Sequence, residues 1–403
     1  MPKLNQLIKQ YGNPDILIDS FNKQSKRYAI WGFDEVLELK DKGLFLNNKF
    51  INEDFELYTQ TTINRWKEES QQLQISCVGF LAYEFKNYLY KHINFQNKLN
   101  NSFPYFWFCK PKIIKEYELD FVELPPHSEY NLELERDILD LFYYRKKIEA
   151  IKSYLKSGDV YQINFTDKKF FHSTFENSFD LYNTLRLSSK PEEGFFLKTP
   201  QFDILSFSPE SLLKVENNII ETAPIKGTRP SSKNQIKDKQ LQHELKNSIK
   251  DKAEHLMIVD LLRNDLGKIC DIGSIKVDQL YDIKTFKTIH HMLTKISGQL
   301  RNGVTEFDIF KALFPGGSIT GAPKESAMKI IDMLESSPRK IYTGSFGYIT
   351  PNKSMYFNIC IRTLLKLNNE YEYGIGGGIV WDSIAEDEWK EAQQKSKILE
   401  PVL

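Results

Sequence analysis

The sequence predicts an α+β fold with antiparallel sheet. Three observations predict it. Short apolar runs bounded by turn residues recur along the chain, helical spacings interrupt them without strict alternation, and 41% hydrophobic residues supply a large core. Strict alternation of strands and helices would instead have favoured a parallel sheet.

The strands are expected where aromatic and β-branched residues cluster between turn signals. They are predicted over residues 75–83, 104–108, 160–171, 202–207, 212–222, 344–349, 355–367 and 371–380. Within 212–222, Asn217 and Asn218 indicate a hairpin turn.

The helices are expected where apolar residues recur every three or four positions. Helices are predicted over 145–156 with Gly158 as its stop, over 237–267 as one long or broken helix, after the capping residue Thr305, from Pro323, and over 386–399.

Length and charge set limits on domains and partners. The chain has 403 residues, with 54 basic and 54 acidic side chains. We expect an N-terminal subdomain over 1–135 with a regulatory or structural role, a catalytic domain over 136–403, and a seam near 125–128. The balanced charge argues against nucleic-acid binding. No apolar run approaches the roughly 18 residues of a membrane span, so we expect a cytoplasmic protein without a membrane partner.

The four cysteines lie far apart, at Cys77, Cys109, Cys270 and Cys360. They form no Cys-x-x-Cys pair, so neither a zinc site nor a dithiol centre is expected. Four cysteines in so long a chain do not make a disulfide scaffold either, and they fit a reducing compartment.

Two residues are candidates for acid–base and nucleophilic chemistry. Lys226 lies in a loop between a proline and a glycine, where a lysine is most often solvated. If it were desolvated beside Arg229, its pKa would fall and its free amine could attack carbon. Glu210 ends an apolar strand; it is either an exposed turn carboxylate or an acid whose proton is held by burial.

Three glutamates are candidates for a metal site. Glu254 lies in a mostly apolar helical run, and Glu388 and Glu391 share one face of the last helix. A Glu-x-x-Glu pair is usually a solvated surface feature. Together with Glu254, however, these carboxylates would offer the hard oxygen ligands that Mg²⁺ prefers.

Further elements are typical of anion binding. The glycine-rich turn 316–324 opens a helix, where free amides attract anions. Glycines 376–378 within a strand indicate a ligand close to the backbone, and Arg362 interrupts an apolar strand. We therefore predict a dianion held by Mg²⁺ at one end and by Arg362 and glycine amides at the other, with Lys226 and Glu210 near its middle.

Several of these segments resemble the chorismate-utilising enzyme family, which includes anthranilate synthase component I, aminodeoxychorismate synthase component I, and the isochorismate and salicylate synthases. The resemblance covers roughly residues 140 to 400 and is loose before them. The matching segments are 224–229, 253–265, 315–324, 361–363 and 376–380. The resemblance implies an anthranilate synthase component I-like α+β fold, in which large, mostly antiparallel sheets form a two-layer β core with helices packed outside.

Two positions sort the members of that family. Its anthranilate synthases usually have alanine where this chain has Lys226, whereas its aminodeoxychorismate synthases have lysine. Its isochorismate-type enzymes have a water-activating lysine where this chain offers Gln162. The resemblance is therefore strongest to the aminodeoxychorismate synthases, component I, which serve 4-aminobenzoate and folate biosynthesis.

The resemblance also implies a reaction. Lys226 would attack C2 of chorismate while Glu210 protonates the departing C4 hydroxyl, and ammonia would then replace the lysine to give 4-amino-4-deoxychorismate. Mg²⁺ would be held by Glu254, Glu388 and Glu391. The substrate contacts implied are Arg362, Tyr348, Gly376, Gly377, Gly378, His291, Thr228 and Thr320. Because no cysteine has the setting of a glutaminase nucleophile, a separate glutamine amidotransferase subunit is expected to supply ammonia.

Three alternatives stay open. The chain could be an anthranilate synthase component I, although Lys226 argues against it. It could be a non-catalytic scaffold that binds a glutaminase. A pyridoxal-phosphate enzyme could use Lys226 and the glycine-rich turn, but that interpretation leaves Glu254, Glu388 and Glu391 without a role.

Overall fold

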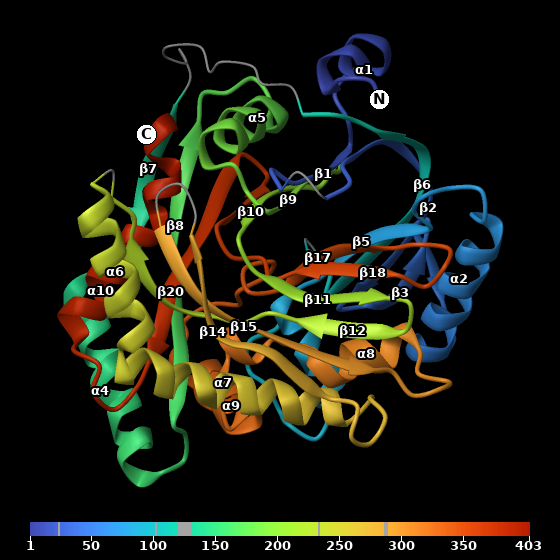
Figure 1. Ribbon diagram of the computed structural model, residues 1–403. Coiled ribbons are helices and arrows are strands. Elements are labelled where there is room, and N and C mark those ends of the chain that lie inside the picture. The colour runs from blue at the N-terminus through green and yellow to red at the C-terminus, as the bar shows by residue number, and fades with distance from the viewer. Residues whose placement is uncertain (23–24, 101–102, 120–130, 233, 286–288) are drawn as a thin grey trace.

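The computed structural model describes residues 1–22, 25–100, 103–119, 131–232, 234–285 and 289–403 (Figure 1). Antiparallel ladders join its strands into one continuous set, and helices pack around them. The predicted α+β class with mostly antiparallel sheet is therefore confirmed. The seam predicted near 125–128 lies outside the described residues.

The first layer of strands forms the right-hand part of Figure 1. Its strands, in order of pairing, are β14 (Lys276–Thr285), β15 (Ile289–Gln299), β12 (Ile219–Thr222), β11 (Ser211–Glu216), β18 (Met355–Asn358), β17 (Ser345–Ile349), β5 (Cys77–Leu81), β6 (Phe106–Glu116) and β2 (Tyr28–Lys40). Strand β13 (Ile225–Pro230) also pairs with β15, and β3 (Gly43–Leu46) and β4 (Lys49–Ile51) extend from β2.

The second layer begins where β1 (Ile16–Asp19) pairs with the first residues of β2. It continues through β9 (Glu193–Lys198), β10 (Phe202–Ser208), β19 (Thr363–Leu367), β20 (Glu370–Ile379), β8 (Gln162–Ser173) and β7 (Leu132–Asp137), with the short β16 (Gly321–Ala322) also on β8.

Aromatic side chains fill the space between the two layers. The rings of Phe195 on β9 and Phe346 on β17 lie 4.7 Å apart, and those of Phe80 on β5 and Phe202 on β10 lie 5.7 Å apart. Ring pairs at this separation add to the free energy gained from burying their area. The two-layer core predicted from the sequence is thus the packing of these strands.

The helices lie outside the sheets (Figure 1). They are α1 (Leu4–Tyr11), α2 (Phe55–Glu69), α3 (Lys86–Leu89), α4 (Leu141–Ser157), α5 (Ser178–Ser189), α6 (Gln235–Asn247), α7 (Ile249–Gly267), α8 (Glu306–Leu313), α9 (Lys324–Leu334) and α10 (Ala385–Gln394). Short 3₁₀ turns occur as η1 (Tyr83–Phe85), η2 (Gly317–Ile319) and η3 (Lys395–Val402). No helix in the described ranges is both long and apolar enough to cross a bilayer.

Local signals account for several element boundaries. Gly158 ends α4 with φ +81°, and Thr305 caps α8 in a reciprocal capping box with Asp308. The long helix predicted over 237–267 is broken at Ser248, whose hydroxyl accepts a hydrogen bond from the Asp251 amide and begins α7.

The chain crosses from one layer to the other at two adjacent places. Strand β10 leads through residues 209–210 into β11, and β18 leads through 359–362 into β19. The two crossings are joined, since the Glu210 carbonyl accepts a hydrogen bond from the Ile359 amide at 3.0 Å. The single strand predicted over 355–367 is therefore wrong: it is interrupted where the chain changes layer, and Arg362 there has φ +51°.

The division into residues 1–135 and 136–403 stays a prediction. Its boundary falls inside β7, and strands from the two sides pair directly. Strand β1 pairs with β9, and β5 pairs with β17.

Candidate active site

Glu210 lies at the first layer crossing and is 6% exposed. Ser318, in the glycine-rich turn, donates a hydrogen bond of 2.7 Å to its Oε1 atom. Burial raises the pKa of Glu210 to about 6, against the opposing effects of the Ser318 hydroxyl and of the nearby Lys226 amine. The sequence left two interpretations of Glu210, an exposed turn carboxylate and an acid whose proton is held by burial. Its position in the structure agrees with the second.

Lys226 lies on β13 and is partly buried. Burial lowers the pKa of its amine, and the positive charge of Lys395 lowers it further. The carboxylates of Glu254, Glu210 and Glu391 oppose that change. These charges act on Lys226 because the fold brings α7, α10 and the layer crossing at residues 209–210 close to β13.

Gly378 forms the wall beside the Lys226 amine. A Cβ atom at this position would stand 3.0 Å from Lys226 Nζ and 3.0 Å from Gln162 Nε2. Gln162 is fully buried, and neither its amide nitrogen nor its amide oxygen has a hydrogen-bond partner among the described residues. Such a group is costly to bury without a partner, so Gln162 is a site residue that the sequence-based set missed.

The glycine run lies on an open strand edge. Strand β19 pairs with β20 only over Glu370–Tyr373, whereas β8 pairs with it up to Ile379. The edge of residues 374–379 that faces away from β8 therefore has no strand partner among the described residues. On this edge Lys395 donates a hydrogen bond of 2.8 Å to the Gly376 carbonyl. Open backbone of this kind fits the anion site predicted at residues 376–378.

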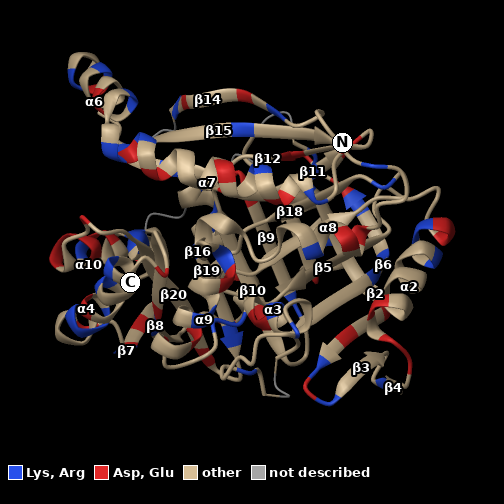
Figure 2. Cartoon of the chain, turned by 90° about the horizontal axis from the view of Figure 1, so that it is seen from below, with Lys and Arg blue, Asp and Glu red and all other residues tan. Residues whose placement is uncertain are grey.

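The three predicted metal ligands come from two helices. Glu254 lies on α7, which runs beside β15, and Glu388 and Glu391 lie on α10, which packs on β20 (Figure 2). Burial raises the pKa of Glu254 and of Glu388, and the charge of Glu391 adds to the effect on Glu388. Lys395 lies 3.0 Å from Glu391 and lowers its pKa.

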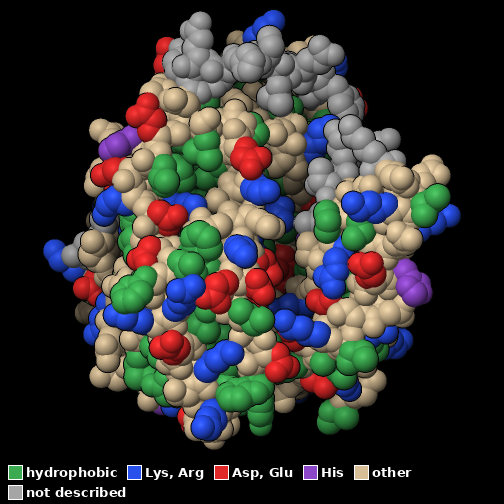
Figure 3. Space-filling model, turned by 90° about the vertical axis from the view of Figure 1, so that its left-hand side faces the viewer, with side chains coloured by type: hydrophobic (Ala, Val, Ile, Leu, Met, Phe, Trp, Pro, Cys, Tyr) green, Lys and Arg blue, Asp and Glu red, His purple; other side chains and the backbone are tan. Residues whose placement is uncertain are grey.

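Lysines lie beside two of these carboxylates. Lys250 lies 3.9 Å from Glu254, and Lys395 pairs with Glu391. No three acidic, histidine or cysteine side chains within the described ranges form a metal-binding group. Figure 3 shows the side of the molecule that carries α6 and α10, with acidic and basic side chains gathered beside a hollow.

Arg362, His291 and Thr228 form a second group. The Arg362 guanidinium is partly buried, which lowers its pKa, and it has no hydrogen bond or ion pair with another described residue. Burial and the charge of Arg362 lower the pKa of His291 to about 4. The His291 Nδ1 atom lies 3.0 Å from the Thr228 hydroxyl. A desolvated guanidinium without a carboxylate is a strong anion-binding candidate.

Thr320 and Tyr348 are placed differently from the other predicted contacts. The buried Thr320 hydroxyl donates to the Gly316 carbonyl at 2.9 Å and so holds the turn together. Tyr348 shares with Phe346 the face of β17 that packs between the layers, where its ring stacks on Tyr356 and meets Tyr28. Its described contacts include neither Lys226 nor Arg362. Tyr373 lies near Arg362, because the charge of that guanidinium opposes the rise in the pKa of Tyr373 that burial causes.

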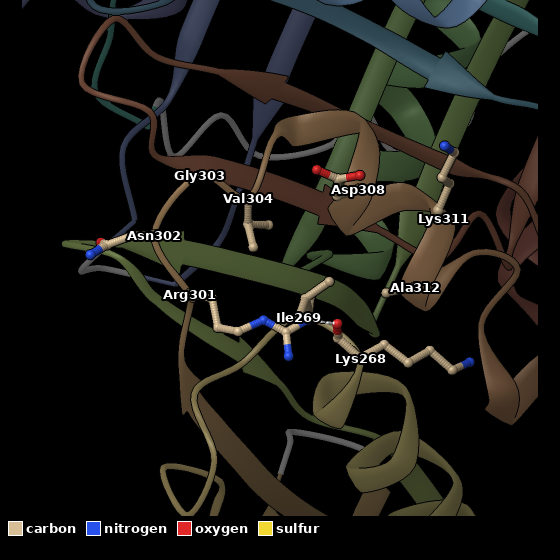
Figure 4. Close-up of a pocket in the computed structure, with 9 residues that line it drawn as sticks. All are labelled: Lys268, Ile269, Arg301, Asn302, Gly303, Val304, Asp308, Lys311 and Ala312. Carbon is tan, nitrogen blue, oxygen red and sulfur yellow. Dashed lines mark hydrogen bonds between the residues drawn. The ribbon is translucent and has the colours of Figure 1, made fainter.

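A pocket of about 480 Å³ lies elsewhere, between the end of α7 and α8 (Figure 4). Its basic side chains already have partners. Lys268 pairs with Asp265 at 2.7 Å, Lys311 pairs with Glu56, and Arg301 donates to the Lys268 carbonyl. This pocket contains none of the predicted site residues.

Comparison with known proteins decides the family. Residues 13–401 match the family of chorismate binding enzymes. The chain belongs to that family.

Curated members of the chorismate binding family include proteins of two names. The chain is 41% identical to aminodeoxychorismate synthase component 1 of Escherichia coli over 253 residues, 62% of this chain and 55% of that protein. It is 38% identical to the Bacillus subtilis protein of that name over 260 residues, 64% and 55% of the two chains. It is also 38% identical to anthranilate synthase component 1 of Aquifex aeolicus over 253 residues, 62% and 51%. The chain thus spans about half the length of these relatives.

Solved structures show the same fold. Anthranilate synthase component I from Streptococcus pneumoniae superimposes with a TM-score of 0.77 at 24% identity, over 93% of this chain and 92% of that one. The menaquinone-specific isochorismate synthase from Escherichia coli superimposes with a TM-score of 0.75 at 16% identity, over 97% and 88%. The anthranilate synthase component I-like fold expected from the resemblance is confirmed.

The side chains of this chorismate binding enzyme offer ligands of the kind that magnesium prefers, although the described residues do not gather them into one metal-binding group. Glu254, Glu388 and Glu391 supply only oxygen ligands, and the first two have raised pKa values because they are buried near like charges. A divalent cation would relieve that repulsion. Lys250 and Lys395 would have to move aside, since they balance the same carboxylates in the structure.

Proposed function

We propose that the chain aminates chorismate as component I of an aminodeoxychorismate synthase, with Mg²⁺ and a partner glutaminase. The observation that carries the proposal is the pair of Lys226 and Glu210. A partly buried amine with a lowered pKa lies near a buried carboxyl with a raised pKa. Environments that move an amine and an acid in these directions are typical of a nucleophile and a general acid.

In the first step, the neutral Lys226 amine forms a bond to C2 of the chorismate ring. The ring double bonds shift, and the C4–O bond breaks. Glu210 gives its proton to the departing hydroxyl, so that water leaves and the Glu210 carboxylate remains. The Ser318 hydroxyl, which donates to Glu210, stabilises that carboxylate.

In the second step, ammonia forms a bond to C4 and the double bonds shift back. The C2–N bond breaks and Lys226 leaves as an amine, while the proton lost by the ammonia nitrogen returns to Glu210. The product is 4-amino-4-deoxychorismate, and both residues regain their starting protonation. Two allylic substitutions by amines replace one difficult substitution by ammonia.

The rest of the site binds the substrate dianion. Arg362 and the open edge at residues 376–378 receive one carboxylate, and Glu254, Glu388 and Glu391 would hold Mg²⁺ for the other. When bound, Mg²⁺ neutralises carboxylate charge and orients the ring. Gln162 offers an amide donor and acceptor next to Lys226.

The ammonia must come from a partner. A glutaminase needs a reactive cysteine thiolate, but all four cysteines of the chain are buried. Burial raises the pKa of each thiol, that of Cys270 to about 11. We propose that a glutamine amidotransferase partner supplies the ammonia.

Anthranilate synthase component I is the second candidate, because a relative with that name is as similar as the Bacillus aminodeoxychorismate synthase. Product analysis from chorismate, Mg²⁺ and an ammonium salt separates the two. The proposal predicts 4-amino-4-deoxychorismate without glutamine. Anthranilate as the product would replace it by the second candidate, and no turnover would favour a non-catalytic scaffold.

A further inference from the structure

Arg339 is a fully enclosed cation behind the site. It lies between α9 and β17 and is 3% exposed. Glu335 accepts two hydrogen bonds from it, at 2.8 Å from Nε and 2.7 Å from Nη2. The same Glu335 carboxylate accepts hydrogen bonds from the amide and hydroxyl of Thr166 on β8. The guanidinium plane is thereby held in one orientation.

The other donors of Arg339 reach two backbone carbonyls on opposite sides. Nη1 donates to the Ile319 carbonyl at 2.9 Å, and Nη2 donates to the Asn164 carbonyl at 2.6 Å. Ile319 follows Ser318 in the glycine-rich turn, and Asn164 lies two residues after Gln162. The Arg339 guanidinium thus links the glycine-rich turn, whose Ser318 donates to Glu210, to strand β8, which carries the unpartnered Gln162 amide.

The N-terminal part of the chain completes the surroundings of Arg339. The Tyr83 ring lies 4.3 Å from the guanidinium carbon, and the Glu84 carboxylate accepts hydrogen bonds from the amides of Arg339 and Lys340 at 2.6 and 2.9 Å. These contacts come from η1, in the N-terminal third of the chain.

From this geometry we infer that Arg339 is a positioning residue: it holds Ser318 against Glu210 and Gln162 beside Lys226. The inference rests on the proposed function for its kinetic consequence only. A lysine cannot replace the arginine, since one ammonium group cannot reach Glu335, Ile319 and Asn164 from a planar fork. Without the planar guanidinium, the glycine-rich turn is no longer held at the Ile319 carbonyl. Glu210 then loses the Ser318 hydroxyl that stabilises its carboxylate.

The test uses Arg339→Lys in the full chain. We expect kcat for chorismate amination to fall about 10²-fold with little change in KM. We also expect the break in the kcat/KM profile near pH 6 to move to higher pH, because losing the Ser318 donor raises the pKa of Glu210. Ser318→Ala should move the break in the same direction, and the double variant should move it no further.

The control is Arg186→Lys, which alters another enclosed arginine, 2% exposed and paired with Asp19 at 2.6 Å, away from the turn. It should lower the melting temperature and leave the break in place. Glu335→Gln keeps the shape of the side chain but weakens its hold on the Arg339 guanidinium. It should have the same effects as Arg339→Lys to a smaller extent. It is the replacement variant if Arg339→Lys does not fold.

A second readout needs no substrate. The Glu210 carboxyl can be titrated by ¹³C NMR in the ligand-free protein, with Glu210→Gln to assign the signal. A midpoint above that of the wild type in Arg339→Lys supports the inference even if chorismate is not the substrate. An unchanged midpoint in both Arg339→Lys and Glu335→Gln overturns it, whether or not the wild type aminates chorismate.

Discussion

Gly378 and Lys226 approach each other so closely that a methyl group at residue 378 would stand 3.0 Å from the lysine amine. Gly378 lies on β20 of one layer, and Lys226 lies on β13, which pairs with the other. The amine therefore occupies a narrow space between two strands that are 152 positions apart in the sequence. In the proposed reaction the chorismate ring binds beside this amine.

Gly378→Ala should therefore displace the amine. The new methyl group forces Lys226 or Gln162 to move by a few tenths of an ångström, and we expect a fall in kcat of about 10²-fold. Gly267→Ala is the control, because its added methyl group meets nothing closer than 3.9 Å. Steady-state kinetics with chorismate and ammonium check both variants. Wild-type turnover in Gly378→Ala would place the reaction elsewhere.

Glu210 should titrate well above an ordinary glutamate. We expect a midpoint near 6 in the ligand-free protein, compared with about 4.3 for an exposed glutamate. Lys226→Ala should raise the midpoint further, since the amine favours the carboxylate form. Lys250→Ala, which removes a more distant lysine of α7, should leave it in place. A downward shift in Lys226→Ala would contradict the proposed proximity of the two groups.

Glu388 should contribute to magnesium binding. Glu388→Gln removes a partly buried carboxylate charge, and we expect Mg²⁺ affinity, measured by calorimetric titration with and without chorismate, to weaken about tenfold or more. Glu386→Gln is the matched control on the same helix, because Glu386 is exposed and pairs with Arg145. Equal affinities in the two variants would remove Glu388 from the site.

The stability of the chain should depend on Lys67 and Glu306, which form an enclosed ion pair between α2 and α8. Lys67→Met leaves the carboxylate without its partner, and we expect a loss of about 3–5 kcal/mol in unfolding free energy. Lys311→Met breaks an exposed pair between the same helices, with Glu56, and should cost less than about 1 kcal/mol. Urea unfolding measures both.

The pH dependence of that pair has a definite sign. Lys67 holds the pKa of Glu306 below its ordinary value in the folded chain. The pair therefore contributes its full stability above the ordinary glutamate pKa and loses it as pH falls through the lowered value. In Lys67→Met the loss of stability as pH falls below about 4.3 should be smaller than in the wild type. An equal loss would show that Glu306 does not titrate as described.

Local sequence signals predicted the local structure well. Asn217 and Asn218 have φ +51° and +62°, the conformation that a two-residue hairpin requires, and asparagine tolerates it. Thr305 and Gly158 likewise mark helix ends through their own side chain or its absence. Such features depend on a few neighbouring residues, so one sequence is enough to identify them.

Features that depend on the layers could not be predicted in this way. The break before Arg362 follows from the change of layer, and an apolar run gives no sign of it. The contact of Tyr348 with the substrate stays a prediction, and its place beside Tyr356 and Tyr28 depends on how the two layers pack. Gln162 was read only as a difference from related enzymes; that its amide is enclosed without a partner is visible only in three dimensions.

The covalent role of Lys226 is the centre of the account, and trapping tests it most directly. The chain is mixed with chorismate and Mg²⁺ without ammonia, quenched in acid and digested for mass spectrometry. The account predicts that the peptide containing Lys226 gains the mass of chorismate less one water, and that Lys226→Ala gains nothing. An adduct on another residue, or steady amination of chorismate by Lys226→Ala at the wild-type rate, would contradict it.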